Sequence, residues 1–122
     1  MLTLETITSK EQWNTELSKL PSAHVLQTWE WGQFKYDTTG WIPHRWAFKR
    51  GGEIVAMCSM GERKAGPLSV MYAPKGPAMD YSDLSLVDEV LTQIQEQAKK
   101  HRAVWVKIDP DIAYATGIPN ED

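Results

Sequence analysis

The 122-residue sequence predicts a mixed α/β (α+β) domain in which a mainly antiparallel sheet is flanked by helices. Three observations lead to this class. Two stretches with apolar residues at helical spacing come first, in the range 10–36. A Gly51-Gly52 pair between two β-rich runs is typical of a tight hairpin. A longer helical stretch then leads to a last β-rich run, as in a crossover connection.

The chain begins with a predicted strand at residues 2–7, followed by a helix. Ser9, with Gln12 three residues later, forms a capping-box pattern that satisfies the first free amides of a helix. Pro21 stops this helix. Its apolar stripe is made by Trp13, Leu17 and Leu20.

A second, shorter helix is predicted within residues 25–36, with Thr28 as its cap. On this helix Trp31, Phe34 and Lys35 share one face. Gly32 weakens the helix by roughly 1 kcal/mol relative to alanine. We therefore expect another part of the chain to pack closely against Gly32.

An antiparallel hairpin is predicted from residues 44–50 and 53–60, joined by the two glycines. Gly66-Pro67 marks the next turn, and 68–73 the next strand. Residues 74–77 are not expected in a central strand, because their two prolines have no amide hydrogen to donate.

Ser85 and Asp88 form a second capping-box pattern, which predicts the start of a long helix. Its apolar stripe consists of Leu84, Val87, Leu91, Ile94 and Ala98. The basic residues of 99–102 suit the C-terminal end of a helix dipole.

The last predicted strand covers 104–108, and an Asp-Pro pair ends it. Alternation places Val104, Val106 and Ile108 on one face, and Trp105, Lys107 and Asp109 on the other.

This order of elements is that of the front half of a GNAT-like (acyl-CoA N-acyltransferase-like) fold. Residues 1–110 are thus predicted to form a partial GNAT-like domain. Residues 111–122 show little pattern and are expected to be a tail or a truncated linker.

Composition excludes several classes of function. A net charge of −3 and a pI of about 5.6 offer no overall cationic face for nucleic acid. One cysteine, Cys58, cannot form an intrachain disulfide, and the first 20 residues lack the apolar core of a signal peptide. We expect a cytoplasmic protein.

Metal and coenzyme sites are not expected from the sequence. His24, His44 and His101 are scattered, without the paired spacing of a zinc site. A coenzyme A site needs a loop rich in free amides, whereas residues 73–78 contain two prolines. The sequence therefore predicts no cofactor.

Three motifs carry a family resemblance: LQTWEWGQFK at 26–35, YAPKGPAMD at 72–80 and VKIDP at 106–110. In their order and spacing they resemble successive signatures of the Fem family (FemA, FemB and FemX). This resemblance covers most of residues 25–110.

The resemblance implies an aminoacyltransferase of peptidoglycan biosynthesis built from two GNAT-like domains. Its donor is aminoacyl-tRNA, and its acceptor is the stem-peptide amine of a muramyl pentapeptide precursor, nucleotide-linked or lipid-linked. This chain would supply the first portion of the first domain and would be inactive alone. The tRNA would be held mainly by other regions, and the reaction could take place at the inner face of the membrane.

Site residues follow from the motifs. Lys35 matches the lysine that contacts the precursor's diphosphate in relatives, and Lys75 stands where many relatives have arginine. Three aromatic residues, Trp29, Trp31 and Tyr72, could line the substrate cleft or serve packing. Asp109 is the candidate catalytic carboxylate, which would orient the attacking amine or accept its proton. Against this role, an Asp-Pro pair at a strand end often only begins a turn.

Two alternatives stay open. One is a non-catalytic binding or assembly module of the same fold, and the other is an acyl-CoA-dependent N-acyltransferase whose cofactor loop lies beyond residue 122. An incomplete sheet would leave an exposed edge strand, so the isolated chain is expected to form homo-oligomers.

Overall fold

The structure, a computed structural model, describes residues 2–110, and the predicted tail at 111–122 lies outside this range. Two short helices precede the main part of the sheet, and a long helix precedes its last strand. The elements in chain order are β1 (Thr3–Thr6), α1 (Lys10–Ser18), a 3-10 turn (Val25–Gln27), α2 (Trp29–Thr39), β2 (Ile42–Arg50), β3 (Glu53–Ala65), β4 (Leu68–Lys75), β5 (Ala78–Met79), α3 (Leu84–Lys100) and β6 (Ala103–Pro110).

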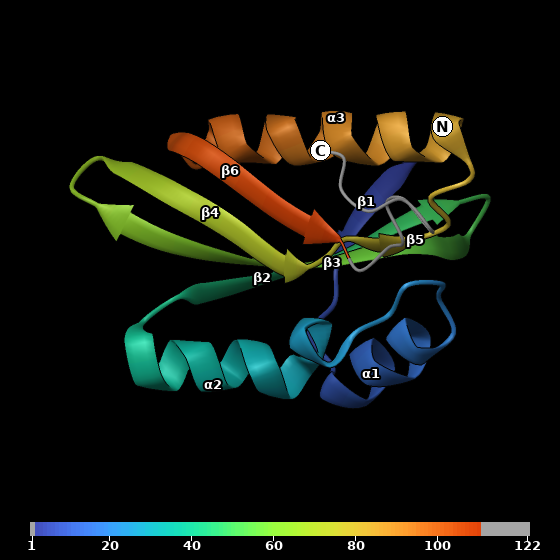
Figure 1. Cartoon of the computed structure of the whole chain (residues 1–122), viewed down its shortest axis with the longest axis horizontal. Coiled ribbons are helices and arrows are strands. Elements are labelled where there is room, and N and C mark those ends of the chain that lie inside the picture. Colours follow the sequence, from blue (N-terminus) through green and yellow to red (C-terminus); the bar gives the residue numbers. More distant parts are fainter. Residues whose placement is uncertain (1, 111–122) are drawn as a thin grey trace, which may run out of the picture.

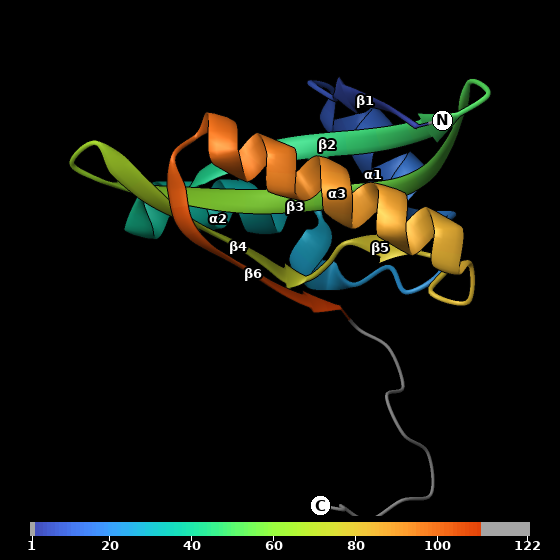
Figure 2. The same cartoon turned by 90° about the horizontal axis from the view of Figure 1, so that it is seen from above.

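One open sheet forms the middle layer, in the order β1-β2-β3-β4-β6, and the short β5 pairs with β3. All pairs are antiparallel except β4 with β6, which are parallel and are connected through α3. Figure 1 shows α3 above the sheet and α1 and α2 below it, and Figure 2 shows α3 running across the strands. The predicted mixed α/β class with a mainly antiparallel sheet is confirmed.

The predicted hairpin is also confirmed. Strands β2 and β3 meet at Gly51 and Gly52, whose φ angles are 61° and 85°. These left-handed values are accessible to glycine without steric cost. The hairpin continues as a meander, because β3 reaches Ala65 and pairs with β4 across the Gly66 turn.

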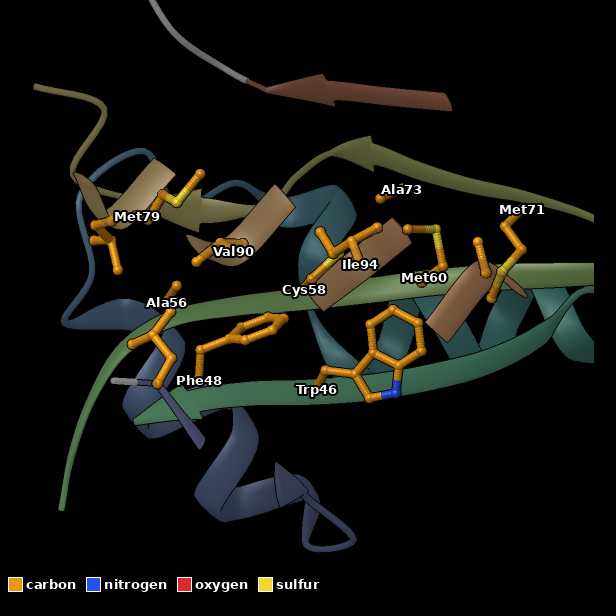
Figure 3. Close-up of a cluster of buried hydrophobic side chains, with 13 residues drawn as sticks. Trp46, Phe48, Ala56, Cys58, Met60, Met71, Ala73, Met79, Val90 and Ile94 are labelled. Atoms are coloured by element: carbon orange, nitrogen blue, oxygen red, sulfur yellow. The ribbon is translucent and has the colours of Figure 1, made fainter. Parts of the chain in front are cut away.

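Two apolar clusters hold the layers together. The larger one lies between the sheet and α3, where the helix contributes Leu86, Val90, Ile94 and Ala98 (Figure 3). The smaller cluster lies on the opposite face and includes Trp13 and Leu17 of α1 with Ala47 and Met57 of the sheet. Both faces of the central strands are therefore buried, which fixes the registers on which the candidate site depends.

The two short helices begin as the sequence predicts. The Ser9 hydroxyl accepts a hydrogen bond from the Gln12 amide at 3.2 Å, and the Thr28 hydroxyl accepts one from the Trp31 amide at 3.3 Å. Helix α2 ends at Gly40, whose φ is 78°. None of the helices within residues 2–110 combines the length and the apolar character that a membrane span requires.

The start of α3 differs from the prediction. Its cap is Asp83 and not Ser85, because the Asp83 carboxylate accepts the Leu86 amide at 3.1 Å. The buried stripe is rotated accordingly: Leu86 and Val90 are buried, whereas the predicted stripe residue Leu84 is 76% exposed.

The face assignment of β6 was wrong at one residue. Ser69 pairs with Ala103 but Val70 pairs with Trp105, so Val104 is an extra residue in the ladder. Val104 is 58% exposed, and Ala103 packs against the core together with Val106 and Ile108. After this irregularity the predicted alternation holds, with Trp105, Lys107 and Asp109 on one face of the sheet.

The expectation that 74–77 contains no central strand was wrong for Pro74. Strand β4 continues to Lys75, with Pro74 opposite Asp109 of β6. The proline is tolerated because β3 has already separated from β4, their last pair being Gly61 with Tyr72. No β3 carbonyl is paired with Pro74, so its missing amide hydrogen removes no ladder bond on that side.

Candidate functional site

A cavity of about 350 Å³ lies between α2 and the sheet, on the face opposite α3. This volume is near the lower end of the range for ligand pockets, roughly 300–1,000 Å³. Three aromatic residues, Trp31, Trp41 and Tyr72, form part of its walls. The lining residues are Leu26, Trp31, Gly32, Lys35, Trp41, Pro43, Ser59, Gly61, Tyr72 and Pro74.

Two glycines allow the walls to approach one another. A Cβ atom on Gly32 would lie 3.2 Å from the Arg45 guanidinium and 3.4 Å from Pro43, so a larger residue requires its neighbours to shift. This confirms the close packing that the sequence predicts at Gly32. A Cβ atom on Gly61 would lie 3.2 Å from the Trp41 ring.

Positive charge gathers around this cavity although the whole chain is acidic. The Lys35 side chain is part of the lining, and within residues 2–110 no carboxylate pairs with its ammonium group. The Lys107 ammonium lies 5.4 Å from the centre of the Tyr72 ring, and the Arg63 guanidinium 5.6 Å from the Trp41 ring. The cavity thus offers aromatic surface and cations to an anionic ligand.

Most of the predicted site residues lie on this face. Lys35, Trp31 and Tyr72 line the cavity together. Asp109 is not a lining residue, but its register partner Pro74 is, so the carboxylate lies on the same sheet face one strand away. Lys75 lies outside the lining, at the end of β4 with a left-handed φ of 56°.

Trp29, for which both a cleft and a packing role were open, is absent from the lining. It packs against the smaller apolar cluster, and the guanidinium of buried Arg45 stacks 3.6 Å from its ring centre. Trp29 therefore positions the start of α2.

Gln27 is the structural residue that sequence reasoning missed. Its side chain is fully buried in the gap between β3 and β4. There Gln27 Nε2 donates to the Ser59 carbonyl at 3.1 Å and to the Pro74 carbonyl at 2.8 Å, while its Oε1 accepts the Ser59 amide at 2.8 Å. The Gln27 side chain thus takes the place of the backbone hydrogen bonds between β3 and β4 where the two strands diverge. It links Ser59, a lining residue of the cavity, to the end of β4.

Trp41, Pro43 and Ser59 were also missed as lining residues. A weak signal exists in β3, where the small residues Ser59 and Gly61 stand on one face, since glycine within a strand often marks a close approach. Nothing in the sequence indicates that this face turns toward α2.

The single thiol of the chain, Cys58, is not a candidate nucleophile. Cys58 is fully buried in the apolar cluster under α3, and burial raises its pKa to about 12. A thiol with such a pKa is protonated at neutral pH and is a poor nucleophile.

Two of the histidines, which are far apart in the sequence, come together in the fold. His44 Nε2 lies 2.8 Å from Glu62 Oε1, and His101 Nδ1 lies 3.5 Å from the same oxygen. Burial lowers the pKa of His44, against the opposite effect of its hydrogen bond to Glu62. This cluster is separate from the cavity.

Comparison with known proteins gives a consistent result. The FemAB family model matches residues 8–121. A lipid II:glycine glycyltransferase of Staphylococcus haemolyticus (strain JCSC1435) is 32% identical over 100 residues, which covers 80% of this chain and 24% of that protein. One from Staphylococcus aureus (strain bovine RF122 / ET3-1) is 32% identical over 99 residues, covering 80% and 23%.

Among solved structures, the crystal structure of FemX superposes with a TM-score of 0.80 and 28% identity, over 92% of this chain and 28% of the FemX chain. This likeness fits the GNAT-like fold that the order of elements predicts. The chain spans about a quarter of the length of the curated relatives it matches.

Proposed function

The chain belongs to the FemAB family, and we propose that it forms the acceptor-binding part of an aminoacyltransferase of peptidoglycan biosynthesis. The enzyme would move an amino acid from aminoacyl-tRNA to the stem-peptide amine of a muramyl pentapeptide precursor. The observation that carries the proposal is the Lys35 ammonium group in an aromatic cavity, on the same sheet face as Asp109.

In this proposal Lys35 binds the diphosphate of the precursor. A compact ammonium on a long aliphatic stem suits a doubly charged phosphate group, and the nearby Lys107 and Arg63 add to the local positive field. Trp31 and Tyr72 supply flat apolar walls for the sugar and peptide portions. Lys75, outside the lining, would contact only the part of the precursor that extends beyond the cavity.

The chemistry is acyl transfer. The stem-peptide amine attacks the carbonyl carbon of the aminoacyl ester, a C–N bond forms, and the C–O bond to the tRNA ribose breaks. The amine loses a proton to a base, and the ribose oxygen gains one. Because the ester is already activated, holding the amine beside it supplies most of the rate. In this proposal Asp109 orients the amine and accepts its proton.

The names of the curated relatives make the substrates more specific. Both are lipid II:glycine glycyltransferases. We therefore propose a lipid-linked precursor as acceptor and glycine as the first amino acid to test. Such an acceptor places the reaction in the cytoplasm, at the inner face of the membrane.

The proposed function is tested with the purified full-length gene product. It is incubated with tRNA charged with glycine, and in parallel reactions with other amino acids, together with lipid-linked or nucleotide-linked muramyl pentapeptide. Mass spectrometry should show an acceptor extended by one or more residues. If no charged tRNA gives an extended peptide with either acceptor, the aminoacyltransferase assignment fails.

Replacing Asp109 with asparagine tests the catalytic carboxylate. We expect kcat to fall about tenfold, less than a full general-base effect of roughly 10²–10⁴, because positioning supplies most of the rate. The KM for the precursor should stay nearly constant, since Asp109 is not part of the cavity lining. Steady-state kinetics with Asp88→Asn on α3 as the control decide this. An unchanged kcat would leave Asp109 with only a structural role in β6.

The oligomeric state is a separate prediction. Among residues 2–110, β6 is bonded to β4 on one side and to no strand on the other, and its Trp105 is 49% exposed. An exposed edge strand pairs readily with another chain. The isolated 122-residue chain should therefore dimerise, as measured by light scattering over a range of concentrations. A monomer at every concentration would contradict this.

A further inference from the structure

A second cluster of functional groups lies on the α3 face of the sheet, away from the cavity. It consists of His44 on β2, Glu62 on β3 and His101, the residue that caps the C-terminal end of α3. The ligand atoms of all three side chains lie within 4.8 Å of one another. The centres of the two imidazole rings lie 4.6 Å apart, and the ring planes are tilted by 48°.

Burial distinguishes this cluster from a surface ion pair. The Glu62 side chain is only 3% exposed, whereas His44 and His101 keep 20% and 30% of their side-chain surface open to solvent. A buried carboxylate is costly unless it is paired or coordinates a metal. The site is therefore closed by the sheet behind Glu62 and open to solvent on the histidine side.

The proposed acyl transfer does not use this cluster. The cavity is lined by Pro43, Ser59 and Gly61, which alternate along β2 and β3 with His44 and Glu62 and so lie on the opposite sheet face. The buried carboxylate and the two imidazoles are therefore available for a role of their own.

The donor set matches that of a divalent transition metal. Zinc binds imidazole nitrogen at about 2.0–2.1 Å and carboxylate oxygen at about 2.0–2.2 Å, so neighbouring ligand atoms in a tetrahedral site lie roughly 3.3 Å apart. The two distances from Glu62 Oε1, 2.8 Å to His44 and 3.5 Å to His101, bracket this value. Small side-chain rotations would point all three atoms at one ion.

We propose that His44, Glu62 and His101 form a binding site for a divalent zinc-like cation, with water at the remaining position. The ion ties the C-terminal end of α3 to strands β2 and β3. Its role is structural, because the site lies on the other face of the sheet from the acceptor cavity.

The test uses the full chain without an affinity tag, after treatment with a chelator that is then removed. Calorimetry with Zn²⁺ should show one ion per chain, and Co²⁺ should produce the visible absorption of a four-coordinate site. Zn²⁺ should also raise the midpoint of thermal unfolding, because a ligand that binds the folded state stabilises it. None of these measurements depends on transferase activity.

Single substitutions identify the ligands. His44→Ala, Glu62→Gln and His101→Ala should each weaken Zn²⁺ binding by at least about tenfold, as loss of even an outer partner of a metal site does. His24→Ala is the matched control, since His24 caps the 3-10 turn and lies outside the cluster. It should leave the affinity unchanged.

Two results would overturn the site. One is the absence of one-to-one binding by the wild-type chain, and the other is equal affinity in wild type and the three ligand variants. Circular dichroism checks that each variant is folded. Should Glu62→Gln fail to fold, the two histidine variants decide, because both side chains are partly exposed and their truncation leaves the core intact.

Discussion

Replacing Lys35 with alanine in the full-length gene product should lower kcat/KM for the muramyl precursor about 10- to 100-fold, the loss of one hydrogen bond to a charged group. Lys35 is the cation in the cavity lining, and within residues 2–110 it has no carboxylate partner that could take over its position. The loss should be mainly in KM, because the diphosphate is bound equally before and during acyl transfer.

Two control variants separate charge from fold. Lys35→Arg keeps the positive charge and should recover part of the activity, although its planar fork differs from a compact ammonium. Lys99→Ala removes an exposed lysine of α3, on the opposite face of the sheet, and should have no effect. If Lys35→Ala and Lys99→Ala have the same kcat/KM, the diphosphate contact does not exist.

Replacing Gln27 with leucine should destabilise the fold by about 3–9 kcal/mol. Leucine has a similar size, but it leaves the amide and carbonyl of Ser59 and the carbonyl of Pro74 without partners, each at a cost of about 1–3 kcal/mol. The loss is a large part of a typical total stability of roughly 5–15 kcal/mol. No backbone group can replace Gln27, because β3 and β4 have diverged at this point.

Urea unfolding followed by tryptophan fluorescence measures this effect. Gln33→Leu on the exposed side of α2 is the matched control and should change the free energy of unfolding by less than about 0.5 kcal/mol. If the free energy of unfolding of Gln27→Leu lies within about 1 kcal/mol of the wild-type value, the backbone groups of Ser59 and Pro74 find other hydrogen-bond partners.

Local sequence rules predicted the parts of the fold that depend on neighbouring residues. The caps at Ser9 and Thr28 involve amides three residues away, and the hairpin needs only two glycines with positive φ. The close contact at Gly32 was predictable because a glycine within a helix is costly unless packing requires it.

The predictions were wrong where two local patterns compete for the same helix start, or where a distant strand sets the register. Asp83 and Ser85 both offer a cap, and the preceding turn, in which the Asp83 amide donates to the Asp80 carbonyl, selects Asp83. Alternation along β6 cannot reveal that Val104 is an extra residue, because the partner strand sets the register.

The candidate site was predictable only in part. The resemblance to the Fem family pointed to Lys35, Trp31 and Tyr72, which share one cavity, but the cavity also needs walls from distant segments, such as Trp41 and Ser59. The histidine–glutamate cluster joins residues 18 and 39 positions from Glu62, a proximity that only the folded sheet creates. Gln27 likewise bonds to partners 32 and 47 positions away.

The central claim is that the ammonium group of Lys35 binds the diphosphate of a muramyl precursor in the cavity between α2 and the sheet. Calorimetry of wild type and Lys35→Ala with two ligands tests it most directly: nucleotide-linked muramyl pentapeptide, and muramyl pentapeptide without the diphosphate. The substitution should weaken binding of the first ligand about 10- to 100-fold and leave the second unchanged. Equal effects on both ligands, or no effect on either, would contradict the claim.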